Sequence, residues 1–144
     1  PKESPFFYLM ETARNLCLVL EKKADLGREI RLAYSQEDKE TLQEIANIKI
    51  PVLLQRLQDF YQSFRTQWNL ENKSFGFEVQ TVRIGGLLQR LKDVQEILNA
   101  YLREEISGIA ELNEPQKAFH YFEQNEIRSL NYNLWTDIVS PSKI

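Results

Sequence analysis

The chain has 144 residues, of which 42% are hydrophobic and 27% are charged, and its formal net charge is −3. This length allows one domain with a sizeable core, and the composition is that of an ordinary soluble globular domain. The acidic balance argues against general nucleic-acid binding, which needs a basic face, and no apolar run reaches the roughly 20 residues needed to cross a bilayer. We therefore expect neither a nucleic acid nor a membrane as partner.

The first predicted helix runs from about Phe6 to Tyr34, with Ser4 as its N-cap and Pro5 in its first turn. Small and apolar residues recur along it at spacings of three and four, which predicts one buried stripe. The stripe consists of Ala13, Leu16, Cys17, Leu20, Ala24 and Gly27.

Cys17 is the only cysteine in the chain, so no internal disulfide can form. Its apolar helical surroundings predict a buried, inert thiol. A chain with no disulfide fits a reducing compartment, and we expect a cytoplasmic protein.

The second predicted helix follows a capping box at Ser35 and Asp38 and continues to about Asn69. Pro51 lies inside it and cannot donate a backbone hydrogen bond. We therefore expect the helix to kink or split near Lys49.

The third predicted helix begins between Phe77 and Gly86 and ends before Pro115. Three long helices with short connections predict an all-α, up-down-up bundle within a single domain, residues 1–144. The remaining segment, 116–144, is rich in aromatic residues without a sustained period. We expect it to be an irregular tail that packs along the bundle.

The search for catalytic or metal-binding patterns finds little. The chain has one cysteine and one histidine, His120, whereas a structural zinc site takes four ligands from such residues. The paired carboxylates Glu37–Asp38 and Glu104–Glu105 are adjacent in helices, so they point about 100° apart rather than into one pocket. We predict no catalytic residue, no metal and no cofactor in this chain.

The joint between the second and third helices is the strongest candidate for a binding site, because aromatic rings stand there beside amide and charged groups. Such groups occur where proteins contact carbohydrates or other proteins. The alternative is a purely structural corner, in which Phe75 and Phe77 plug the end of the bundle. A Gly85–Gly86 pair follows and predicts either close packing or a special backbone angle. The candidate residues are Arg65, Trp68, Asn69, Asn72, Lys73, Phe75, Phe77, Glu78 and Arg83.

The stretch FYQSFRTQWNLENKSFGFEVQTVRIGGLLQRL, residues 60–91, resembles the C-terminal helical domain of some bacterial glycoside hydrolase family 20 enzymes. The similarity extends upstream through LEKKADLGREIRLAY and downstream to NYNLWTDIVSPS, so it covers nearly the whole chain. These enzymes are exo-acting β-N-acetylhexosaminidases.

The resemblance implies that the chemistry lies in a (β/α)8 barrel that this chain is too short to contain. In that barrel, an adjacent Asp-Glu pair assists attack by the substrate's own acetamido group. No Asp-Glu dipeptide occurs in the sequence, so no catalytic residue carries over.

We therefore expect a detached, non-catalytic domain that packs on and stabilises the catalytic barrel of its own polypeptide, with the corner as the contact. A bolder version has Trp68 or Arg83 reaching the sugar pocket, in one subunit or across a homodimer. The alternative function is a free-standing helical module that docks a partner protein through the same corner.

Overall fold

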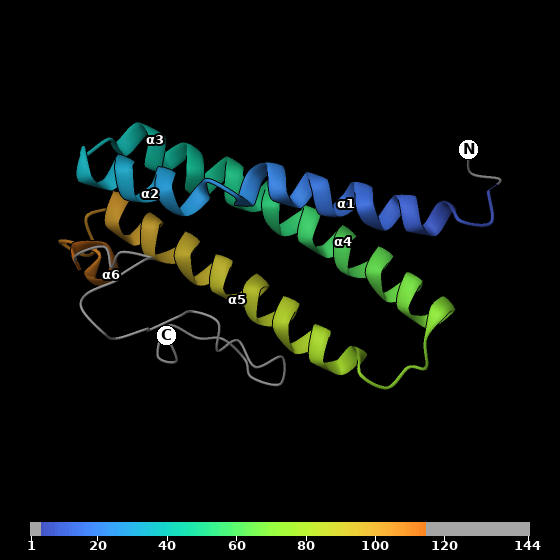
Figure 1. Cartoon of the computed structure of the whole chain (residues 1–144). Helices are drawn as coiled ribbons and strands as arrows, with labels where there is room; N and C mark the ends of the chain where they lie inside the picture. The colour runs from blue at the N-terminus through green and yellow to red at the C-terminus, as the bar shows by residue number, and fades with distance from the viewer. Residues whose placement is uncertain (1–3, 115–144) are drawn as a thin grey trace, which may run out of the picture. The chain divides into compact units, whose positions relative to one another are not determined.

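The computed structural model describes residues 4–114, and within this range the protein consists of helices joined by short turns, without a β-strand (Figure 1). The prediction of an all-α bundle is confirmed. The elements are α1 (Phe7–Lys23), α2 (Leu26–Ser35), α3 (Lys39–Glu44), the π-helix η1 (Ile45–Lys49), α4 (Ile50–Glu71), α5 (Phe77–Leu102) and α6 (Ala110–Asn113).

The chain divides into two compact units, Pro1–Asn113 and Glu114–Ile144. The predicted tail, 116–144, lies outside the described residues, so its packing and the single-domain assignment stay predictions.

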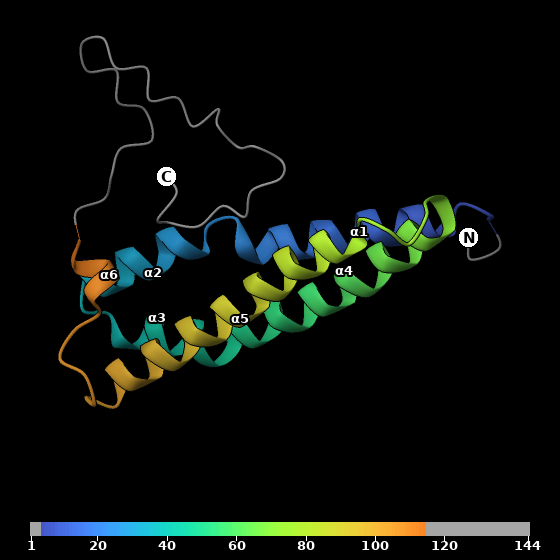
Figure 2. The same cartoon turned by 90° about the horizontal axis from the view of Figure 1, so that it is seen from below.

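Within the first unit the chain runs up, down and up. In Figures 1 and 2, α1 lies beside α4, and α4 in turn packs against α5. At the other end of the unit, α2 and α3 pack together, and α3 also contacts α5. The core lies where the start of α4 meets η1, α3 and α5, and its most deeply buried side chains are Leu42, Ile45, Ile50, Leu53 and Leu98.

The first predicted helix is two helices, α1 and α2, separated by a turn at Ala24 and Asp25. Asp25 and Gly27 are weak helix formers, which makes a break here inexpensive. After the break, Leu26 and Ile30 of α2 enter the core. In one straight helix, Leu26 and Ile30 would instead continue along the axis of α1.

The predicted irregularity near Lys49 is confirmed, and it takes the form of a π turn. The Ile50 N–H donates to the Ile45 carbonyl, five residues back. Pro51 follows and has no N–H to offer the Ala46 carbonyl. The side-chain amide of Gln95 on α5 donates to that carbonyl instead, at 2.7 Å. A hydrogen bond between η1 and α5 thus stands in place of the backbone bond that the proline cannot make.

The predicted burial of the first helix's apolar stripe is wrong. Leu16, Cys17 and Leu20 are exposed, and so are Ala13, Ala24 and Gly27. The prediction of a buried Cys17 thiol is wrong for the same reason. Periodicity shows that one side of a helix is apolar, but it does not show which side the neighbouring helix covers.

The face of α1 that packs on α4 holds Thr12 and Val19, which are both buried. It is joined to α4 by the Asn15 side-chain amide, which donates to the Ser63 hydroxyl at 3.1 Å. In α1, therefore, a polar residue takes part in the interface with α4, while apolar residues lie on the exposed side of the helix. Among the described helices, none is both long and apolar enough to cross a membrane.

Candidate functional site

The corner between α4 and α5 is a five-residue turn, residues 72–76. The Asn72 N–H closes α4 by donating to the Trp68 carbonyl at 2.8 Å. Gly76 has φ +97°, a left-handed conformation that glycine adopts without a steric penalty. Its N–H donates to the Glu78 carboxylate at 2.7 Å, two residues into the next helix. Glu78 therefore serves the turn itself.

An aromatic cluster closes the bundle behind this turn. Phe77 is only 7% exposed, and its ring centroid lies 5.5 Å from that of Phe64, 5.6 Å from Tyr61 and 5.8 Å from Trp68. The Trp68 indole N–H donates to the Lys73 carbonyl at 2.9 Å. The indole N–H is thus bonded within the turn itself. Through this bond and the ring contacts, Trp68 and Phe77 hold the turn against α4.

Phe75 does not join this cluster, because its side chain is 87% exposed. The structural reading of the corner as a plug made of both phenylalanines is therefore right for Phe77 and wrong for Phe75. Of the other candidates, Arg83 is half-buried in α5, and the rest are exposed: Arg65, Asn69, Asn72, Lys73 and Glu78. The structure brings Trp68, Lys73 and Phe77 together, and it leaves Phe75 facing solvent.

The exposed side of α5 continues the apolar surface that Phe75 begins. Val79 and Val82 of α5 are both exposed and lie three residues apart on one side of that helix, directly after the turn that carries Phe75. Leu70 at the end of α4 is exposed as well. We call Leu70, Phe75, Val79 and Val82 the corner surface. Sequence reasoning missed Val79 and Val82, although their spacing of three residues within the third predicted helix was the available signal.

The glycine pair on α5 lies in open space. A Cβ placed on Gly85 or Gly86 would meet no atom within 4 Å outside its own helix. Neither residue has a positive φ, so the predicted special backbone angle is wrong. Close packing against another described residue is not found either. Two glycines inside a helix lower its stability by about 1 kcal/mol each relative to alanine. No contact among the described residues offsets this cost.

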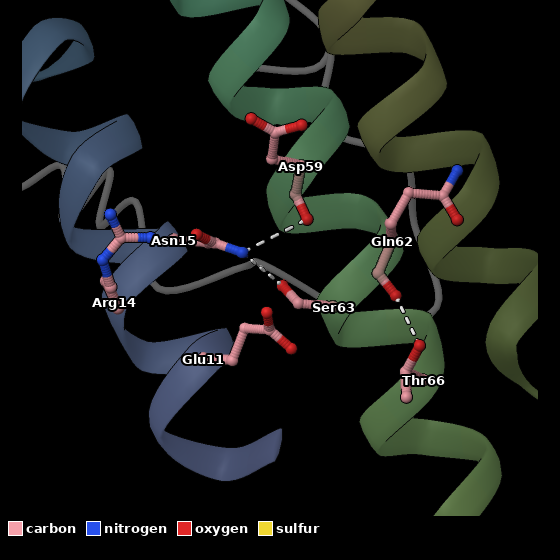
Figure 3. A pocket seen from close by; sticks show the side chains of 7 residues that line it. All are labelled: Glu11, Arg14, Asn15, Asp59, Gln62, Ser63 and Thr66. Carbon is pink, nitrogen blue, oxygen red and sulfur yellow. Dashed lines mark hydrogen bonds between the residues drawn. The ribbon is translucent and has the colours of Figure 1, made fainter. Parts of the chain in front are cut away.

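A polar hollow of about 380 Å³ lies between α1 and α4 (Figure 3). The lining includes the two carboxylates Glu11 and Asp59, but no aromatic side chain offers the flat apolar face typical of sugar subsites. No pattern in the sequence indicated this hollow, since its residues come from two helices about 45 positions apart. They are Glu11, Arg14, Asn15, Asp59, Gln62, Ser63 and Thr66.

One hydrogen bond ties the start of α1 to the corner. The Tyr8 hydroxyl donates to the Glu71 carboxylate at 3.1 Å. Desolvation of the phenol and the adjacent Glu71 carboxylate raise the pKa of Tyr8 above its ordinary value, which favours the neutral form that donates this hydrogen bond. Within residues 4–114, no cluster of three or more His, Cys, Asp or Glu side chains could hold a metal ion.

Comparison with known protein families supplies what the geometry alone does not. The sequence model described as Glycoside Hydrolase 20C C-terminal domain matches residues 2–131. The chain belongs to this family. No curated protein matches the chain.

Membership of this family accounts for a helical domain in which we predicted no catalytic residue. It is a non-catalytic, helical part of a glycoside hydrolase family 20 enzyme, and a catalytic domain belongs to the same polypeptide. The functional surfaces of this domain are therefore to be sought where it can meet that neighbour, rather than in a pocket of its own.

Proposed function

We propose that this domain packs on and stabilises the catalytic domain of a cytoplasmic exo-β-N-acetylhexosaminidase, which removes terminal N-acetylhexosamine residues from glycans. The observation that supports the proposal is the corner surface. The turn carries a phenylalanine that is 87% exposed, and α5, which follows the turn, carries two exposed valines and an open glycine pair. Contiguous exposed apolar surface on a soluble domain marks an interaction site.

The glycine pair adds to this argument. Small residues let a second backbone approach a helix closely, and they are costly where nothing approaches. Gly85 and Gly86 extend the corner surface along α5. A neighbouring domain that packs on this side would explain why the helix tolerates both of them.

Contact with the sugar itself is the bolder part of the proposal. Trp68 is a poor candidate, because its indole N–H already donates to the Lys73 carbonyl. Arg83 on α5 remains the other candidate, and the exposed pair Arg65 and Asn69, one turn apart on α4, offers further polar groups for contacts across the interface.

The test uses the full-length enzyme and compares three variants by thermal unfolding and by kcat/KM on an aryl β-N-acetylglucosaminide. Phe75→Asp should lower the Tm of the enzyme, because it would bury a charge at the interface. Leu32→Asp is the matched control, since Leu32 is an exposed leucine on α2, remote in sequence from the corner. Equal Tm values for the two variants would contradict the corner contact.

Gly86→Ala changes the stability of the enzyme in opposite directions, depending on whether α5 is covered. If α5 faces solvent in the enzyme, the alanine stabilises it by about 1 kcal/mol through helix propensity. If the catalytic domain packs on α5, the added methyl group destabilises the enzyme instead. We expect destabilisation.

A further inference from the structure

The exposed side of α1 carries a second apolar surface, separate from the corner surface. It starts at the N-cap residue Phe6 and continues through Met10 and Leu20 on α1, which are 72% and 48% exposed. Spacings of three and four residues place its members on one side of the helix. We call it the α1 stripe, and its members are Phe6, Met10, Ala13, Leu16, Cys17 and Leu20.

The stripe is unlike the scattered exposed leucines of an ordinary protein surface. None of its six members is charged or a strong hydrogen-bonding residue, and it follows a helix of 17 residues, about 26 Å long. Single exposed apolar residues are normal, whereas a continuous patch of several hundred Å² marks an interface. The helix meanwhile contacts α4 through its other side, where Asn15 bonds Ser63.

The size of the stripe distinguishes between two kinds of partner. A stable complex of two separate proteins typically takes about 20–30 residues from each partner, whereas the stripe has six. Contacts between domains of one chain are smaller, at about 600–1,500 Å², because the covalent connection provides a high effective concentration. The small number of residues in the stripe therefore favours a partner in the same polypeptide over a second copy.

The order of the domains points to the same partner. The family description makes this a C-terminal domain, and the matching region begins at residue 2. A catalytic domain thus belongs to the same polypeptide, and it is the partner that family membership supplies for an exposed apolar surface.

We propose that the α1 stripe is a docking surface for the catalytic domain of the same polypeptide, and that this contact is additional to the one at the corner surface. The proposal rests on the proposed function only in requiring that such a domain precedes this one. It assigns the exposed apolar side of α1 a covered, dry position in the intact enzyme, with Cys17 inside it.

Site-specific photo-cross-linking in the full-length enzyme identifies the occupant directly. A benzoyl-phenylalanine at position 16 should link, on illumination, to a peptide of the catalytic domain without doubling the mass of the chain. The same residue at position 32, on α2, is the control and should not form that link. A link from position 16 to residues 115–144, a product of doubled mass, or no link at all would overturn the proposal.

Alkylation of Cys17 provides an independent measurement. In the full-length enzyme carrying Glu11→Cys, an exposed position on another side of α1, we expect Cys17 to react about tenfold more slowly than the introduced thiol. Leu20→Glu should then raise the rate at Cys17, because a charge opposes docking of an apolar surface. Equal rates at the two thiols of the enzyme without Leu20→Glu would refute burial of the stripe.

The two contacts can fail separately. Slow alkylation of Cys17, together with an unchanged Tm for Phe75→Asp, would refute the corner contact and support the contact at the α1 stripe. Fast alkylation together with a destabilising Phe75→Asp would do the reverse.

Discussion

The hydrogen bond between Gln95 and the Ala46 carbonyl allows a quantitative test of how the bundle accommodates Pro51. Ala46 is fully buried, and the 2.7 Å bond from the Gln95 amide reaches it across two helices. Replacing Gln95 by leucine keeps most of the side-chain volume but leaves a buried carbonyl without its donor. Such a loss costs about 1–3 kcal/mol.

Urea unfolding of the chain, followed by helical circular dichroism, measures this cost. Gln89→Leu is the matched control, because Gln89 lies on the same helix and donates only to Asp93, one turn away on the exposed side. An exposed contact of this kind is worth no more than about 0.5 kcal/mol. We expect Gln95→Leu to cost at least about 1 kcal/mol more than the control.

A double-mutant cycle with Pro51→Ala tests the mechanism itself. Alanine restores an N–H at position 51. The Ala46 carbonyl then gains a backbone donor, from residue 51 in a π turn or from Ile50 in an α turn. The cost of Gln95→Leu should therefore fall by about 1 kcal/mol in the Pro51→Ala background. The same cost in both backgrounds would refute the role assigned to the proline.

Two further predictions concern the turn and a helix cap. Gly76→Ala should destabilise the chain by about 1–2 kcal/mol in the same urea assay, because φ is +97° and the new Cβ would lie 3.3 Å from the Trp68 ring; a neutral result would contradict the left-handed turn. Asp38 accepts a hydrogen bond from the Thr41 N–H at 3.0 Å, and this bond, with a second from the Thr41 hydroxyl, lowers the pKa of Asp38. Its contribution is therefore full above the ordinary aspartate pKa and is lost as the pH falls through the lowered value, so the Tm gap to Asp38→Ala should be largest near neutral pH and shrink in acid. A gap that is constant from pH 7 to pH 2 would mean that the carboxylate does not cap α3.

Much of the architecture was predictable from local sequence. Helical periodicity indicated an all-α bundle, and Pro51 indicated the irregularity next to Lys49. The capping box predicted at Ser35 and Asp38 is wrong, because Ser35 is the last residue of α2 and Asp38 itself is the N-cap of α3. The long mixed motif around the corner indicated the family, because its residues are specific in a way that helix stripes are not. These features depend on neighbours in sequence, so sequence alone could determine them.

The distribution of burial depended on tertiary structure. The α1 stripe has the periodicity of a core face, yet α4 packs on the other side of the helix through Thr12 and Val19. Phe75 and Phe77 are two residues apart in one motif, but the left-handed turn at Gly76 separates them into an exposed ring and a buried one. Hydrophobicity can be read along the chain, whereas the surface that covers each apolar face is set by how the helices meet, and that is a property of the packed structure.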